Sequence, residues 1–295
     1  MTDQKILIIF NPRAGKTYRP NYRLSFENQL KSFLPQASCD WLETNYDLNR
    51  QLLTLNLNAY AKIIVIGGDG TVKQAAEFIL KNNLNVPLAI IPQGSANVLA
   101  GSLGIPRNEQ RAIEIAALGK TRAIDVGLIN NEHYFLVGLS VGLISEAILQ
   151  TGLIAKNRWG ILAYLITLLK QKTTAHSLFK FTIDGQNYEV SGNTLLITNT
   201  FSMFGVKPRS FSEYTDGVLE LTVAKNKSIW GILPMAVFTW LNKNILPLMF
   251  VRTGRLLTIS EQSLAGQCVQ VDGEPLSVKK IEATIVPQKL KVITK

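Results

Sequence analysis

One acidic residue stands among three glycines in the segment VIGGDGTVKQAA, residues 65–76. The apolar run KIIVIGG (62–68) leads into Asp69, and apolar residues at helical spacing follow it. A strand that turns through glycines into a helix presents backbone N–H groups and a positive dipole end, which together bind phosphate. A carboxylate placed there is repelled by phosphate unless a cation lies between them or unless it takes a proton from the attacking hydroxyl. Both roles belong to phosphoryl transfer from a magnesium nucleotide. Asp69 could instead cap the helix that follows, although capping explains none of the neighbouring glycines.

Two further glycine-bearing turns follow predicted strands. NPRAG (11–15) comes after KILIIF (5–10), and PQGSAN (92–97) ends the strand PLAIIPQGS (87–95). In open parallel sheets, ligands bind at the carboxyl ends of the strands, so three such turns predict a nucleotide site there. Neither Rossmann nor Walker A spacing is present. Each turn taken alone is also compatible with an ordinary connection from strand to helix.

A second acidic turn lies near the C-terminus, in VDGEPL (271–276), where Asp272 and Glu274 flank Gly273. An Asp-Gly pair between short apolar runs is typical of a β-hairpin turn, and the residues alone favour that interpretation. An acid pair that moves protons is the alternative.

The elements that must position these residues differ between the two parts of the chain. In the first part, short apolar strands alternate with helical patterns, which predicts a parallel sheet covered on both sides. We expect strands at 5–10, 38–44, 62–68 and 87–95, and helices at 22–33, 47–57, 72–81, 96–103 and 109–118. After about residue 120, hairpin signals at Asn130–Asn131 and Asp184–Gly185 join strands with alternating faces, which indicates antiparallel β structure. Helices are expected to be inserted there, mainly at 142–172 and 228–250.

The length of 295 residues also favours two domains. We therefore predict an α/β nucleotide-binding domain with a parallel sheet at 1–122. A β-rich lipid-substrate domain with inserted helices would occupy 123–295, and residues 287–295 would return to the first domain.

The charge is concentrated in two stretches without any acid, 147–183 and 221–260. They hold ten basic residues, which equals the net charge of +10, and three of the four tryptophans. Basic side chains beside Trp and long aliphatic runs suit a membrane surface with anionic lipid. Nucleic acid is the other usual partner of a basic protein, but the apolar runs favour lipid. Two solvated faces with ordinary core tryptophans are the alternative.

Neither a membrane span nor an export signal is predicted. The apolar run 229–241 is too short to cross a bilayer, and the start MTDQKILIIF lacks the features of a signal peptide. Cys39 and Cys268 form no metal or redox motif and are expected to be reduced thiols, and the two histidines lack metal-ligand spacing. These features predict a cytoplasmic protein that associates peripherally with a membrane.

The motifs occur in a recognisable series: NPRAG, GGDGT, PQGSAN, IDVG (124–127), TDGVLE (215–220) and VDGE. This series resembles the diacylglycerol kinase catalytic-domain family, and more narrowly its soluble bacterial lipid kinases, which are related to sphingosine kinases. GGDGT alone is shared with NAD kinases, whereas the whole series is specific and covers essentially the whole chain.

The resemblance implies an α/β nucleotide domain followed by a β-sandwich domain, with the active site in the cleft between them. It implies ATP with Mg²⁺ as donor and a lipid hydroxyl, most simply that of a diacylglycerol-like lipid, as acceptor. The positions that match the family's nucleotide contacts are Asn11, Pro12, Arg13, Gly15, Thr44, Gly67, Gly68, Asp69, Gly70, Thr71, Gly94, Ser95 and Asn97.

The resemblance also assigns roles to the acids. Asp69 matches a carboxylate near the phosphates and magnesium, and Asp125 matches a member of the metal-linked hydrogen-bond network. Asp272 matches the proposed catalytic base, with Glu274 beside it and Asp69 as the rival for that role.

Two positions depart from the family pattern. Val98 stands where an acid is common, so one part of the metal-linked network is in doubt. Thr215 replaces one acid of a turn that often holds a structural magnesium, which leaves Asp216 and Glu220 as a weakened metal site.

Three functions therefore stay open. The first is an ATP-dependent lipid kinase that binds no nucleic acid, and it could form a homodimer through an exposed sheet edge. The second is a non-catalytic regulatory protein that binds lipid or nucleotide. The third is a kinase for a soluble acceptor such as NAD.

Overall fold

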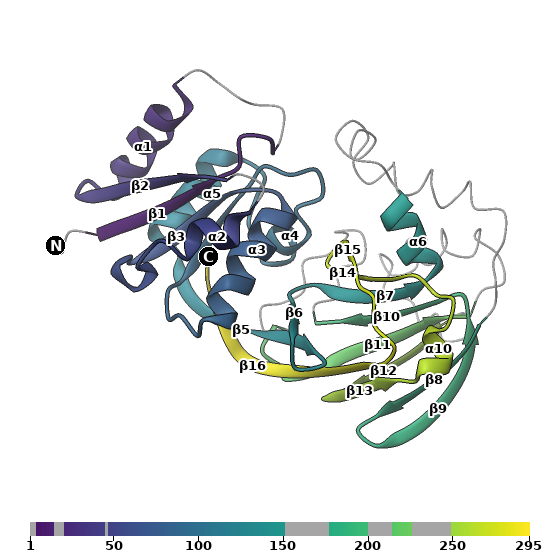
Figure 1. Ribbon diagram of the computed structural model, residues 1–295. Coiled ribbons are helices and arrows are strands. Elements are labelled where there is room, and N and C mark those ends of the chain that lie inside the picture. The colour runs from purple at the N-terminus through teal and green to yellow at the C-terminus, as the bar shows by residue number, and fades with distance from the viewer. Residues whose placement is uncertain (1–3, 15–20, 45–46, 151–176, 200–213, 226–248) are drawn as a thin grey trace. The chain divides into compact units, whose positions relative to one another are not determined.

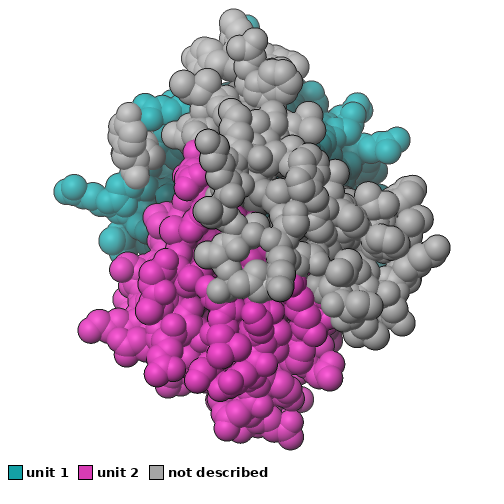
Figure 2. All heavy atoms as spheres, turned by 90° about the vertical axis from the view of Figure 1, so that its right-hand side faces the viewer, with its two compact units in different colours: residues 1–124, 288–295 teal, residues 125–287 magenta. Residues whose placement is uncertain are grey.

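The computed structural model describes residues 4–14, 21–44, 47–150, 177–199, 214–225 and 249–295 (Figure 1). The chain divides into two compact units, which Figure 2 shows in different colours. Unit 1 comprises residues 1–124 and 288–295, and unit 2 comprises residues 125–287.

Unit 1 is built on a parallel sheet with the strand order β2-β1-β3-β4. Its strands are β1 (Gln4–Phe10), β2 (Ala37–Glu43), β3 (Lys62–Gly67) and β4 (Leu88–Pro92). The last part of β16 (Ile281–Thr294) extends this sheet, because Val292 pairs with Leu88 in parallel register. Most residues of β1, β3 and β4 are buried without alternation, which is typical of parallel strands covered on both faces.

The helices of unit 1 follow its strands in alternation. They are α1 (Tyr22–Phe33), α2 (Leu48–Leu52), α3 (Asp69–Lys81), α4 (Val98–Ser102) and α5 (Glu109–Leu118), with a 3-10 turn at Leu57–Ala59. The helix predicted at 47–57 is wrong in its second half, because α2 ends at Leu52. Both the N–H and the hydroxyl of Thr54 bond to the carbonyl of Gln51, which closes a tighter turn and ends the helix.

Unit 2 contains two sheets in which strands pair mainly in antiparallel fashion. The first has the order β16-β13-β8-β9, with β5 paired to β16 and β6. The second has the order β12-β11-β10-β7-β14-β15. The bounds not yet given are β5 (Lys120–Ile129), β6 (His133–Phe135), β7 (Gly138–Gly142), β8 (Ser177–Ile183), β9 (Gln186–Gly192), β10 (Thr194–Thr198), β11 (Leu219–Ala224), β12 (Met249–Gly254), β13 (Leu256–Ile259), β14 (Val269–Val271) and β15 (Glu274–Pro275).

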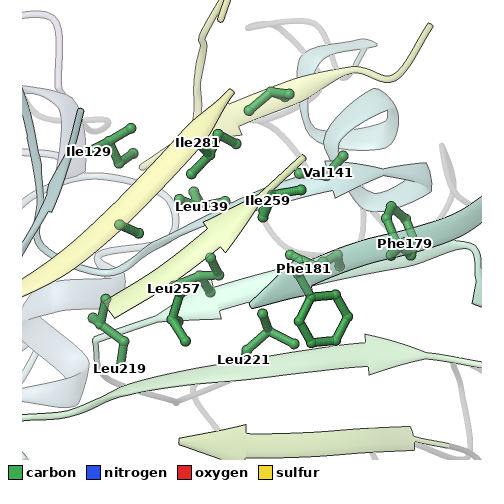
Figure 3. Close-up of a cluster of buried hydrophobic side chains, with 14 of the residues drawn as sticks. Ile129, Leu139, Val141, Phe179, Phe181, Leu219, Leu221, Leu257, Ile259 and Ile281 are labelled. Atoms are coloured by element: carbon green, nitrogen blue, oxygen red, sulfur yellow. The ribbon is translucent and has the colours of Figure 1, made fainter. Parts of the chain in front are cut away.

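The core of unit 2 lies between these two sheets (Figure 3). Phe179 and Phe181 of β8 face Leu139 and Val141 of β7 in one buried cluster, and residues of β11 and β13 complete it. Buried side chains alternate along β8 with the period of two that is typical of a sandwich strand, whereas β7 is buried along its whole length. The predicted fold class, an α/β domain with a parallel sheet followed by an antiparallel β-sandwich, is confirmed.

The glycine of the IDVG motif has a packing role in this unit. Gly127 of β5 lies directly opposite Phe135 of β6, and any Cβ at Gly127 would overlap the phenyl ring. The aromatic ring therefore covers the bare backbone of the facing strand.

The inserted helices are only partly described. Helix α6 (Leu143–Gln150) begins the first predicted insertion, and residues 151–172 and 228–248 lie outside the described residues. The second prediction extends too far, because residues 249–254 form strand β12, paired with β11. Among the helices that the structure describes, none is long and apolar enough to cross a membrane.

Candidate functional site

The turns GGDGT and PQGSAN are packed directly against each other in unit 1. A Cβ on Gly94 would lie 2.6 Å from the Cα of Gly68 and 2.8 Å from the Oδ1 of Asn97. A Cβ on Gly67 would lie 2.9 Å from the Cβ of Thr71. Gly68 and Gly94 are therefore required because their backbones touch, which joins the carboxyl ends of β3 and β4 into one platform, and Gly67 leaves room for the Thr71 side chain.

Asp69 connects the two turns. It is the first residue of α3, and its half-buried carboxylate lies near the backbone N–H groups of Asn97, Val98 and Leu99 at the start of α4. Burial raises the pKa of the Asp69 carboxyl, and the backbone hydrogen bonds oppose that shift. Gly68 takes the N-cap position of α3, and Asn97 takes that of α4, so Asp69 lies between the starts of two helices.

Asn97 and Arg107 hold the PQGSAN turn in shape. Asn97 adopts a left-handed backbone with φ of 51°. Its side chain accepts from the N–H of Gly94 at 2.8 Å and donates to the carbonyl of Gly94 at 2.6 Å. The guanidinium of Arg107 donates to the carbonyls of Ser95 and Ala96 at 2.9 and 2.8 Å. Sequence reasoning missed Arg107, since no motif marks a residue ten positions beyond the turn.

The NPRAG turn reaches the same platform. The Asn11 side chain donates to the Oγ1 of Thr71 at 2.8 Å and accepts from the N–H of Arg13 at 3.0 Å. Pro12 follows Asn11 within this turn. Thr44 follows β2, and its N–H donates to the carbonyl of Phe10 at 2.8 Å. Gly15 lies outside the described residues.

The space in front of this platform is open at Gly70. A Cβ there would meet no atom within 4 Å, and Gly70 is exposed. The N–H groups in the first turn of α3 have no carbonyl partner within their own helix. A ligand phosphate could therefore approach the backbone closely at this point.

In unit 2, the segment VDGE forms a tight hairpin between β14 and β15. Asp272 and Gly273 have φ values of 49° and 88°, and Val271 pairs with Glu274 across the turn. Positive φ at both central residues is the signature of a type I′ turn. The hairpin interpretation of this motif is therefore confirmed.

The carboxylate of Asp272 is held by three backbone groups at the start of β7. Its Oδ2 accepts from the N–H of Leu136 at 2.8 Å, and its Oδ1 accepts from Val137 and Gly138 at 3.0 and 2.9 Å. Charge-assisted bonds of this kind fix the orientation of a carboxylate. Glu274 is exposed beside it.

Gln270 also supports this turn and was missed by sequence reasoning. Its side-chain oxygen accepts from the N–H of Gly273 at 2.6 Å. A glutamine between two valines in VQVDGE is the signal that could have found it, because a polar residue buried in a short strand needs partners.

Asp125 lies buried in unit 2 and anchors the TDGVLE turn. Its Oδ2 accepts from the N–H of Gly217 at 2.8 Å, and its carbonyl accepts from the Nδ2 of Asn199 at 2.7 Å. Asp216 is exposed on this turn, and Glu220 is half-buried on β11. Among the residues that the structure describes, no three His, Cys, Asp or Glu are grouped so that they could hold a metal ion.

The candidate residues thus form two sets, one in each unit. Unit 1 gathers Asn11, Thr44, Asp69, Thr71 and Asn97 at the carboxyl edge of its parallel sheet. Unit 2 places Asp272 and Glu274 on one hairpin. Val98, a departure from the family pattern, contributes a backbone N–H to Asp69 whatever its side chain.

Comparison with known proteins shows which proteins this chain is similar to. Residues 5–129 match the model of the diacylglycerol kinase catalytic domain. The chain is 25% identical to a Streptococcus pneumoniae protein named "Putative lipid kinase", over 99% of this chain and 98% of that protein. It is 29% identical to a Pectobacterium atrosepticum protein named "Probable lipid kinase YegS-like", over 76% of this chain and 75% of that protein.

Solved structures share the fold. Two Bacillus anthracis structures described as diacylglycerol kinases, the first of them as "putative", superpose with TM-scores of 0.79 and 0.75, at 23% and 22% identity. The first superposition covers 100% of this chain and 98% of the other, and the second covers 99% and 97%. The resemblance carried by the motifs is confirmed, because residues 5–129 match the diacylglycerol kinase catalytic-domain model and both relatives are named as lipid kinases.

Proposed function

We propose that this protein is an ATP-dependent lipid kinase that transfers the γ-phosphoryl group of ATP to the hydroxyl of a diacylglycerol-like lipid. The match of residues 5–129 and the names of the relatives support a kinase. The observation that carries the proposal is the contact of the GGDGT and PQGSAN turns, which places the half-buried Asp69 near the backbone N–H groups at the start of α4, at the edge of a parallel sheet.

The triphosphate would bind at the N-terminus of α3. Gly70 leaves room for a close approach to the backbone, and the first-turn N–H groups supply donors. The hydroxyl of Thr71, held by Asn11, would add a side-chain contact. Arg13, exposed on the NPRAG turn, would add positive charge.

The donor set of unit 1 fits Mg²⁺ brought in with the nucleotide. This ion keeps several waters and needs only one or two protein carboxylates beside the substrate phosphates, so Asp69 suffices as its protein ligand. When bound, Mg-ATP supplies the reactive phosphoryl group and neutralises charge that develops on it. Asp125 would belong to the metal-linked network, and Asp216 with Glu220 would form the weakened second metal site.

Asp272 would act as the general base and take the proton of the lipid hydroxyl. Its backbone donors hold the carboxylate in one orientation, so little reorganisation is needed when the proton moves. Glu274 would assist from the same hairpin. The interdomain active site that the resemblance implies stays a prediction, and Asp69 is the rival for the role of base.

The lipid would enter through the acid-free stretches 147–183 and 221–260, which would also bind an anionic membrane surface. Their described basic residues, in sandwich strands or at strand ends, are Lys180, Lys225, Arg252 and Arg255. Their tryptophans lie outside the described residues. Peripheral membrane association and a homodimer remain predictions.

Transfer of ³²P from γ-labelled ATP to a panel of lipids in mixed micelles with Mg²⁺ tests the proposal. Label in a lipid, lost in Asp272→Asn and Asp69→Asn, would establish the kinase and name its substrate class. Asp184→Asn is the matched control, because Asp184 sits in a second Asp-Gly hairpin of unit 2 and also bonds backbone N–H groups.

The opposite outcomes separate the other functions. Transfer to NAD that does not depend on lipid would identify a kinase for a soluble acceptor. ATP binding without transfer to any acceptor would identify a non-catalytic binding protein.

A further inference from the structure

A chain of buried hydrogen bonds in unit 2 reaches the Asp272 hairpin from within the sheet. Gln270 of β14 accepts from the N–H of Gly273 through Oε1 at 2.6 Å and donates from Nε2 to the Oγ of Ser140 at 2.8 Å. The Oγ of Ser140, on β7, lies 2.8 Å from the Oγ of Ser145 in the first turn of α6. The chain therefore links α6, β7, β14 and the hairpin.

The direction of these bonds is determined by the one partner that can only donate. The N–H of Gly273 has no acceptor capacity, so the oxygen of the Gln270 amide must face it and the nitrogen must face Ser140. Ser140 accepts that bond, and its hydroxyl shares a further hydrogen bond with Ser145 in which either oxygen can donate. Ser140 and Ser145 are fully buried, and Gln270 is 6% exposed. Fully satisfied buried networks of this kind are rigid.

The hairpin is short, and the network fixes its glycine side. β15 contains only two residues, both exposed, and pairs with β14 at two positions. The Asp272 carboxylate holds one side of the turn through residues 136–138. The Gln270 amide holds the other side through the backbone of Gly273. The N–H of Asp272 also donates to the carbonyl of Gly138 at 2.9 Å, so Asp272 is fixed on its own side. Loss of the Gln270 amide would release Gly273, and Glu274 would shift with it.

We propose that Gln270 is a positioning residue, which sets the Asp272–Glu274 hairpin in its productive orientation and passes the restraint to β7 and α6. The inference rests on the proposed function, since it assigns Asp272 and Glu274 to the phosphoryl-transfer site. The competing explanation is that the network contributes only to the stability of unit 2.

Gln270→Met tests this, because it keeps the length of the side chain and removes both hydrogen bonds. Its matched control is Ser263→Ala. The Ser263 hydroxyl is also buried in unit 2 and bonds the N–H and carbonyl of Lys180 at 2.6 and 3.1 Å, without contact to the hairpin. Steady-state kinetics, urea unfolding and amide hydrogen exchange at Gly273 are measured for both variants.

For Gln270→Met, we expect kcat to fall roughly 10- to 100-fold, as small misplacements of catalytic groups do, with KM for ATP within about twofold of wild type. The Gly273 amide should exchange faster. For Ser263→Ala, kcat and Gly273 exchange should stay at wild-type values although unfolding shifts to lower urea. Ser140→Ala should give a smaller loss of kcat than Gln270→Met, and Ser145→Ala a smaller one still.

Equal losses of kcat in Gln270→Met and Ser263→Ala at equal losses of stability would overturn the inference. Unchanged Gly273 exchange in Gln270→Met would also overturn it. If the wild type transfers no phosphate, the proposed function fails, whereas the exchange measurement still decides whether Gln270 holds the turn.

Discussion

Two hairpins of unit 2 have the same turn and different surroundings. Asp184–Gly185 joins β8 to β9 with φ values of 48° and 83°, and Asp272–Gly273 joins β14 to β15 with 49° and 88°. In both, the aspartate carboxylate accepts backbone N–H bonds from a segment distant in sequence. The hydrogen bonds of Asp184 are exposed, whereas those of Asp272 are partly buried. The Asp272 turn is also bonded by the Gln270 side chain, which accepts from the N–H of Gly273.

The comparison shows that a structural and a functional interpretation of an Asp-Gly turn do not exclude each other. The turn geometry is local and identical, so it cannot reveal which aspartate takes part in chemistry. The GGDGT turn of unit 1 provides the contrast. There Gly68 and Gly94 have no positive φ, and they are needed because two backbones touch.

The largest effect on stability is expected from Gly94→Ala. The new methyl would overlap Gly68 and the Asn97 side chain, so the two turns must separate, at a cost of about 3 kcal/mol in the free energy of unfolding. Gly70→Ala is the control, because its methyl would point into open space. Urea unfolding measures both, and equal costs would mean that contact between the turns is unimportant.

Asp272→Ala should cost about 2 kcal/mol, because three backbone N–H groups lose a partly buried acceptor. Asp184→Ala should cost no more than about 1 kcal/mol, since its two donors are exposed and water replaces the carboxylate. Chemical denaturation of the two variants compares them directly. A larger loss for Asp184→Ala would contradict the ranking by burial.

The two hairpin glycines should behave alike. Gly273→Ala and Gly185→Ala each force a methyl-bearing residue into left-handed backbone with no steric contact, at a cost of about 1 kcal/mol. Asn at either position should restore part of the loss, because Asn tolerates this conformation. Thermal unfolding provides the measurement, and a much larger effect at Gly273 would reveal a contact beyond the turn itself.

The smallest effect is a change in the pH dependence of stability. Burial raises the pKa of Asp69 in the folded protein above its ordinary value of 3.8, so ionisation favours the unfolded chain. The wild type should therefore lose stability relative to Asp69→Asn as pH rises from 3.8 through the pKa of Asp69 in the folded protein. Above that pKa, the difference in the free energy of unfolding between the two proteins should stay constant. Urea unfolding of both proteins at a series of pH values follows this difference.

Asp40 provides a control of opposite sign in the same unit. Hydrogen bonds from Lys5 and Tyr60 lower the pKa of Asp40, so its ionisation favours the folded state. Relative to Asp40→Asn, wild type should gain stability as pH rises from the lowered folded pKa to the ordinary value. If the stability difference between wild type and variant changed with pH in the same direction for Asp40 and Asp69, the causes assigned to their two pKa shifts would be contradicted.

Much of the fold could be predicted from local patterns. The continuous apolar runs KILIIF and KIIVIGG form buried parallel strands, and the pair Asp184–Gly185 forms the expected hairpin. The end of α2 could not be placed, because Thr54 competes with the helix through its own hydroxyl. That competition depends on a rotamer choice that composition does not reveal.

In the candidate site, the sequence predicted the residues that stand in a distinctive local motif, but it did not predict the groups that contact them. Asp69 and Asp272 stand out among glycines, but the groups that bind their carboxylates are backbone N–H groups of residues 97–99 and 136–138. Every residue except proline carries such a group, so no residue type marks it. Gln270 was missed for a related reason, because its partner Ser140 is 130 positions away.

The sequence by itself determined the hairpin turns, because glycine and its neighbouring aspartate readily adopt the positive φ that such a turn requires. Asp272–Gly273 forms a hairpin for this reason. Only the tertiary structure decided where each carboxylate points and which glycines touch. Gly68 and Gly94 come together because β3 and β4 are neighbours in a parallel sheet. The residues between the two glycines contain no local pattern that predicts this contact.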